Sequence, residues 1–160
     1  MNDWIKQYFP FIFPLYFAAL YTLVMYWIAL VGGWRLLAKR FRLQGTFAGE
    51  KWTGQSAAMR WLTRYNNVLT IGADSAGLYL SPFILFRAWH PALFVPWSEI
   101  TDVRETRFLF SKFVVMRLGR VEEIPFRIRA SLAAQIRAAA GSEWPAEYTR
   151  ALTSPPPPIG

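Results

Sequence analysis

Hydrophobic residues are unevenly spaced along this 160-residue chain. The longest apolar run extends from Tyr8 to Trp34 and contains 27 residues without a charge, ten of them aromatic. Residues 8–31 would form about 36 Å of helix at 1.5 Å per residue, and the hydrocarbon core of a bilayer is about 30 Å thick. The pattern predicts a single transmembrane helix within residues 8–34, preceded by a short extracytoplasmic N-terminus at 1–7.

Two prolines lie in the first turns of this predicted helix. Proline is tolerated near a helix start, so Pro14 either kinks the helix or marks its beginning. A cleaved secretory signal is one alternative, but the run is longer than the 7–15-residue apolar region of such signals. A buried core helix is another, although the rest of the chain could not cover a helix that is apolar on every side.

Basic residues gather directly after the apolar run. The net charge is +8, and residues 35–64 hold seven basic residues and only Glu50 as an acid. The positive-inside rule therefore predicts a single-pass protein of the inner (plasma) membrane with a cytoplasmic C-terminal domain. The predicted contacts to anionic lipid headgroups are Arg35, Lys39, Arg40 and Arg42. No nucleic-acid partner is expected, because such a protein would spread its basic residues over the folded domain.

The segment that follows the apolar run has helical spacing. Trp34, Leu37 and Phe41 recur on one face, with basic residues between them. This predicts an interfacial continuation of the helix, within a basic juxtamembrane helix and linker at 35–55. A plain stop-transfer cluster without lipid preference is the alternative.

From about Ser56 the hydrophobic period changes toward two, which predicts strands. A strand is expected over 58–64, a turn at Tyr65-Asn66-Asn67, and a second strand over 68–71. Other short strands are expected at 78–81, 92–95, 97–100, 103–110, 113–118 and 123–128, with Pro96 marking an edge or a bend. Ser131 is expected to cap a helix over 132–140 that ends at Gly141, and the Pro-rich tail at 142–160 is expected to be disordered.

These elements indicate an α+β, mainly β, class: the transmembrane helix followed by a small β-barrel closed by a C-terminal helix. The stretches 69–80 (LTIGADSAGLYL) and 93–100 (LFVPWSEI) resemble bacterial pleckstrin-homology-like (PH-like) and GRAM-like domains. The resemblance implies a PH-like domain over residues 56–141. It implies lipid binding or an assembly role, and it supplies no site residue.

Catalytic chemistry is poorly represented in the sequence. There is no cysteine, and His90 is the only histidine, which excludes thiolate catalysis, a His pair and Cys-based zinc sites. Glu122 and Glu123 are adjacent, so in a strand their carboxylates would point to opposite faces. No enzyme activity, metal or cofactor is expected.

Two further groups are candidate sites. Phe83, Ile84, Leu85 and Phe86, followed by Arg87, either fill the core or form a loop that enters the bilayer or a partner. A phosphate patch is the second candidate, with solvated strand faces as its alternative; it comprises Arg60, Arg64, Arg127 and Arg129.

The function predicted from these features is non-enzymatic binding of anionic lipid, or of a partner protein, at the cytoplasmic membrane surface. The alternative is a structural or accessory subunit of a larger membrane protein complex. The expected partners are membrane lipids, with other membrane proteins as a second class.

Overall fold

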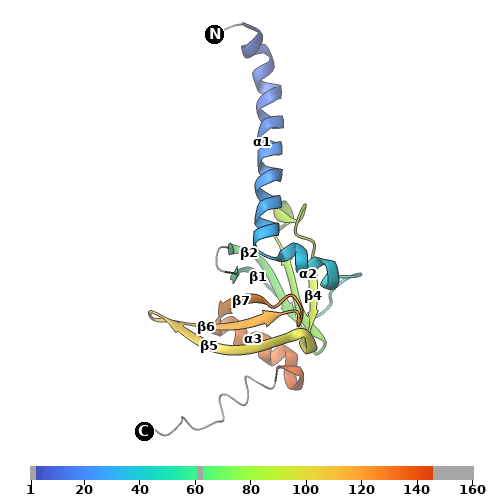
Figure 1. Cartoon of the computed structure of the whole chain (residues 1–160), viewed down its shortest axis with the longest axis vertical. Helices are drawn as coiled ribbons and strands as arrows, with labels where there is room; N and C mark the ends of the chain where they lie inside the picture. Colours follow the sequence, from blue (N-terminus) through green and yellow to red (C-terminus); the bar gives the residue numbers. More distant parts are fainter. Residues whose placement is uncertain (1–2, 61–62, 146–160) are drawn as a thin grey trace.

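The computed structural model of this chain describes residues 3–60 and 63–145. It begins with α1 (Asp3–Val31), a helix that extends far out from the rest of the molecule (Figure 1). The stretch Tyr8–Val31 is long and apolar enough to cross a membrane, and most of it is exposed. Pro10 and Pro14 both lie inside the helix, so neither marks its start. Residues 146–160 of the expected disordered tail lie outside the described residues. The expectation is wrong for the start of the tail, because Gly141–Glu143 form a 3-10 turn and Trp144 is buried against Trp97.

A turn at Gly32-Gly33 separates α1 from α2 (Trp34–Phe41). Gly33 has φ 80°, and a Cβ there would lie 2.7 Å from Cδ1 of Ile124, so both the conformation and the space require glycine. The apolar face of α2 is buried in the domain core. The expected interfacial continuation of α1 is therefore wrong in one respect: α2 packs its apolar face into the same core as the sheet residues, not against a bilayer, and leaves its basic face outside.

The remainder is a curled sheet of seven antiparallel strands with one long helix on it (Figure 1). The strands are β1 (Glu50–Met59), β2 (Thr63–Ala73), β3 (Gly77–Pro82), β4 (Leu93–Pro96), β5 (Ile100–Phe108), β6 (Ser111–Leu118) and β7 (Ile124–Arg129). Their order is β4-β3-β2-β1-β7-β6-β5, so two meanders, β1–β4 and β5–β7, are joined where β1 pairs with β7. The predicted α+β, mainly β, class is confirmed, and β4 lies at the sheet edge, as Pro96 indicated.

Irregular pairing bends the sheet. The β1–β2 register shifts twice, near Gly54 and near Asn67, and both residues have positive φ. Bulges of this kind increase local twist and bend the strand. The predicted turn at 65–67 is therefore wrong: asparagine tolerates the left-handed conformation, and here it forms a bulge inside β2 rather than a turn. The β1–β2 connection instead follows Met59, and the predicted strand over 58–64 is divided by it.

The core lies on one face of the sheet and is closed by α3 (Ala130–Ala140). Leu132 and Ile136 of α3 are buried against residues such as Phe126 and Met116. α3 lies across the sheet from α1 (Figure 1). Its N-cap is Arg129, without a side-chain cap, so the capping role expected for Ser131 is wrong; Gly141 follows the helix with φ 62°.

Candidate functional site

The segment after β3 leaves the sheet and rises beside the lower end of α1 (Figure 1). It contains a short 3-10 turn, Ile84–Phe86. The Tyr21 hydroxyl donates a hydrogen bond to the carbonyl of Leu85. Further along the loop, the rings of Tyr26 and Trp89 pack edge to face with centroids 5.4 Å apart. Residues 83–89, hereafter the apolar loop, are thus fixed to α1 at two levels.

Most apolar side chains of this loop are exposed. Phe83, Ile84 and Leu85 are 56%, 67% and 66% exposed, and Phe86 is half-buried. The expectation that they fill the core is therefore wrong for the first three, because the sheet core is already filled by strand residues and α2. Tyr21 lies ten residues before the end of α1, which is about 15 Å along the helix axis. The loop therefore lies beside the candidate membrane span, not below it.

A basic pocket of about 280 Å³ lies directly below the apolar loop. Its basic lining residues are Arg35, Lys39, Arg42 and Arg87, and no acidic side chain lines it. The first three come from α2 and the residue after it, and Arg87 comes from the loop. The guanidinium carbon of Arg35 also lies 4.8 Å above the ring of Tyr26, which connects the pocket to α1. The pocket therefore gathers four positive charges at one end of the apolar helix.

Arg40, the remaining headgroup candidate, has a different environment. Its guanidinium forms ion pairs with Glu99 at 3.6 Å and with Glu122 at 3.3 Å. It does not line the basic pocket. Arg40 therefore joins α2 to the domain. Both pairs are partly exposed, so each contributes little to stability.

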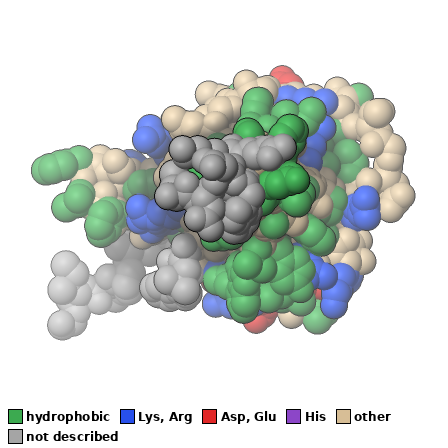
Figure 2. Space-filling view, turned by 90° about the horizontal axis from the view of Figure 1, so that it is seen from above, with side chains coloured by type: hydrophobic (Ala, Val, Ile, Leu, Met, Phe, Trp, Pro, Cys, Tyr) green, Lys and Arg blue, Asp and Glu red, His purple; other side chains and the backbone are tan. Residues whose placement is uncertain are grey.

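An apolar groove of about 510 Å³ runs along α1 above the basic pocket. Trp89 lines both hollows. The groove residues are Leu15, Ala18, Ala19, Thr22, Leu23, Tyr26 and Trp89. Seen from the N-terminal side of α1, hydrophobic side chains gather around the helix, Lys and Arg lie among and around them, and little acidic surface is visible (Figure 2). A cationic pocket continuous with an apolar groove is suited to an amphipathic anion.

An aromatic cluster supports the loop from beneath. The ring of Trp34 lies 5.6 Å from that of Tyr65 and 5.3 Å from that of His90, and its indole N–H donates to the carbonyl of Pro91 at 2.9 Å. His90 is fully buried, with Nε2 3.2 Å from the Tyr65 hydroxyl. Burial lowers the pKa of His90 to about 4, partly opposed by the backbone of Phe86, and burial raises the pKa of Tyr65. Both side chains are therefore neutral near pH 7.

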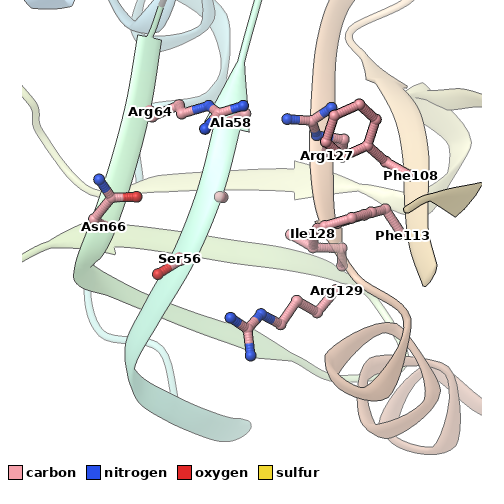
Figure 3. Close-up of a pocket in the computed structure, with 10 residues that line it drawn as sticks. Ser56, Ala58, Arg64, Asn66, Phe108, Phe113, Arg127, Ile128 and Arg129 are labelled. Carbon is pink, nitrogen blue, oxygen red and sulfur yellow. The ribbon is translucent and has the colours of Figure 1, made fainter. Parts of the chain in front are cut away.

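The arginine patch is partly assembled. Arg64, Arg127 and Arg129 line one pocket of about 250 Å³ on the sheet face opposite the core (Figure 3). Arg60 does not line this pocket, but it lines an adjoining hollow of about 600 Å³ together with Arg64 and Arg127. It lies in the β1–β2 turn with φ 51°, and its guanidinium donates to the carbonyl of Val31 at 3.3 Å. This contact satisfies a free carbonyl at the end of α1, a place where a cation also interacts well with the helix dipole.

Sequence reasoning did not assign Trp89, His90 and the α1 groove to a site. Their roles depend on the loop rising along α1, a contact between segments more than 60 residues apart. Within residues 3–60 and 63–145, no group of three acidic or histidine side chains is placed to hold a metal ion. No family model, curated protein or solved structure matches this chain.

Proposed function

We propose that this chain is a membrane-anchored, non-enzymatic PH-like module that binds anionic phospholipid at the cytoplasmic face of the inner membrane. The observation that carries the proposal is the basic pocket, in which Arg35, Lys39, Arg42 and Arg87 meet without a carboxylate. It lies at the end of a helix that is long and apolar enough to span a bilayer. Positive charge beside one end of a span favours the cytoplasmic side.

Several features support a lipid as the ligand. The basic pocket suits the phosphate of a headgroup, since guanidinium groups bind phosphate oxygens in a bidentate manner. The α1 groove suits an acyl chain, and Trp89, which borders both, suits the interface between them. The exposed Phe83, Ile84 and Leu85 would enter the acyl region beside α1. A PH-like assignment is supported by the seven antiparallel strands and the helix that closes them.

Neutralising the basic pocket is expected to abolish lipid preference. In the full chain, Arg35→Gln, Lys39→Gln, Arg42→Gln and Arg87→Gln together should reduce the preference for phosphatidylglycerol over phosphatidylcholine at least about tenfold, because each basic group near an anionic surface contributes about 1 kcal/mol. Native mass spectrometry from detergent with both lipids at equal concentration measures retained lipid. Arg137→Gln on α3, an exposed cation across the sheet from α1, is the matched control. An unchanged preference in the quadruple variant would contradict the proposal.

The depth of the apolar loop can be measured directly, because the chain has no cysteine. A nitroxide on Ile84→Cys, with the full chain in vesicles, is expected to collide more often with oxygen than with a water-soluble nickel complex. A nitroxide on Phe110→Cys, at the fully exposed tip between β5 and β6, should show the reverse. Equal nickel accessibility at both positions would show that the loop remains in water.

The same exposed tip favours a second candidate function. Phe108, Leu109 and Phe110 form an apolar projection at the end of the β5–β6 hairpin, away from α1 (Figure 1). Exposed apolar surface of this kind is typical of protein contacts. A structural or accessory subunit of a membrane complex would use it to hold a neighbouring subunit. A stoichiometric partner recovered in mild detergent without added lipid would distinguish this function from lipid binding.

A further inference from the structure

We propose a second anion site, independent of the basic pocket, in which Arg64, Arg127 and Arg129 bind the phosphate group of a phosphomonoester. These residues line the hollow on the sheet face opposite the core (Figure 3). None of its lining residues belongs to α1, α2 or the apolar loop. The ligand could therefore occupy it whether or not lipid fills the basic pocket.

Strand register brings the first two arginines together. Ala58 of β1 pairs with Arg64 of β2 on one side and with Arg127 of β7 on the other. Residues opposite one another in a sheet project to the same face, and strands are about 4.8 Å apart, so the two Cα atoms are about 10 Å apart. The small Ala58 side chain leaves a trough between them, and the two guanidinium groups point toward one another over it (Figure 3). That spacing allows one phosphate to contact both.

Arg129 is the third cation of the hollow, and its guanidinium group lies apart from the facing pair (Figure 3). It follows Arg127 by two residues on β7, so the two side chains lie on the same face. Within the part of the chain that the structure describes, no ion pair joins Arg64, Arg127 or Arg129 to a carboxylate. The hollow is lined by no acidic residue, and Asn66 supplies a polar amide. Arg64 and Arg127 also line an adjoining hollow of about 600 Å³, to which Asp102 contributes a carboxylate. That carboxylate pairs with other arginines, so a bound dianion would relieve the remaining repulsion among the three cations.

Two other arginines on this face differ from those of the hollow, because each lies close to a carboxylate. Arg117 lies 3.1 Å from Asp102, and Arg104 lies 3.9 Å from the same carboxylate. Both thus have an internal anion. Arg64, Arg127 and Arg129 have no such ion pair within the described residues, and this difference favours an anionic ligand in the hollow.

Aromatic rings form another wall of the hollow. Phe108 and Phe113 line it, and the guanidinium of Arg127 lies 5.2 Å from the centre of the Phe113 ring. The stacking restrains Arg127 in the direction of the trough. The exposed Phe108 ring offers a surface for a flat or apolar organic group. The volume, about 250 Å³, accommodates a phosphate together with such a group. The site thus fits a phosphomonoester better than inorganic phosphate.

Calorimetry on the full chain in zwitterionic detergent tests the site, with phenyl phosphate and inorganic phosphate as free probes. Nanodiscs with and without phosphatidic acid test a lipid source for the same group. Phenyl phosphate is expected to bind saturably and more tightly than inorganic phosphate, and Arg64→Gln with Arg129→Gln should weaken it at least tenfold. Both side chains are exposed, so these changes should leave the fold intact. Arg107→Gln, on the opposite face of β5, is the matched control.

Each outcome decides the proposal. Binding confined to phosphatidic-acid nanodiscs, and lost in the double variant, supports the site with a lipid as the source of phosphate. Binding of free phenyl phosphate that is lost in the double variant supports a soluble source. Absence of saturable binding to every probe, or equal affinity in wild type and double variant, overturns it. The quadruple variant of the basic pocket should bind phenyl phosphate normally, so failure of the lipid proposal and failure of this one are separable.

Discussion

Replacing Trp34 with alanine is expected to lower the free energy of unfolding of the domain by about 3–5 kcal/mol, the range observed when a large aromatic side chain is removed from a core. The Trp34 side chain is completely buried. It contacts the rings of Tyr65 and His90, and its N–H donates to Pro91. The substitution therefore leaves a cavity and also removes the hydrogen bond that holds Pro91, two residues after the apolar loop.

Denaturant unfolding of the full chain in detergent, monitored by circular dichroism, measures this loss. Leu36→Ala is the matched control, since Leu36 belongs to the same helix and is exposed. It should cost less than about 1 kcal/mol, as surface substitutions usually do. If Trp34→Ala were as mild as the control, the packing of α2 on the sheet would be incorrect. The variant should also free the apolar loop from α1, with a rise in nickel accessibility at position 84.

The second large effect concerns the charge state of His90. Its folded-state pKa is about 4, against an ordinary value of 6.5, because the ring is buried. Between these two values the unfolded state binds more protons than the folded state, so stability falls as pH falls through that window. At about 1.4 kcal/mol per pKa unit the loss approaches 3 kcal/mol by pH 4, and the stability is fully present above pH 6.5.

The chain has a single histidine, so one imidazole resonance in a proton NMR titration reports this pKa without ambiguity. Carboxylates also titrate near pH 4, so the unfolding free energy is best compared between wild type and His90→Gln from pH 7 to pH 5. The unfolding free energy should fall more steeply with decreasing pH in wild type than in the variant, by an amount that the pKa from the histidine titration predicts. A resonance that titrates near 6.5 would show that the ring is exposed to water.

These two predictions concern the same structural unit. Trp34 belongs to α2, His90 follows the apolar loop, and Tyr65 belongs to β2, so the cluster joins three separate segments below the basic pocket. Loss of this support should therefore weaken lipid preference even though none of the three residues lines the basic pocket. Their effect would be indirect, through the positions of Arg87 and Trp89.

Sequence alone determined the features that depend on local pattern. A charge-free run with no polar face predicts a membrane-length helix, because every side chain along it must find an apolar environment. The basic residues after it, the alternating segments, the C-terminal helix and the edge position of β4 also follow from residues close together in the chain. The Asn66-Asn67 pair misled this reasoning, because asparagine permits a positive φ but does not specify whether the chain reverses or bulges.

Tertiary structure decided which apolar environment each segment meets and which charges share a site. Both α2 and the apolar loop contain large apolar side chains. The hydrophobic pattern therefore could not show that those of α2 enter the core whereas most of those in the apolar loop remain exposed. Arg40 and Arg42 are likewise equivalent in sequence, yet one pairs with Glu122 and the other lines the basic pocket. These outcomes depend on contacts between distant segments, and such contacts exist only when the sheet has formed and curled around its core.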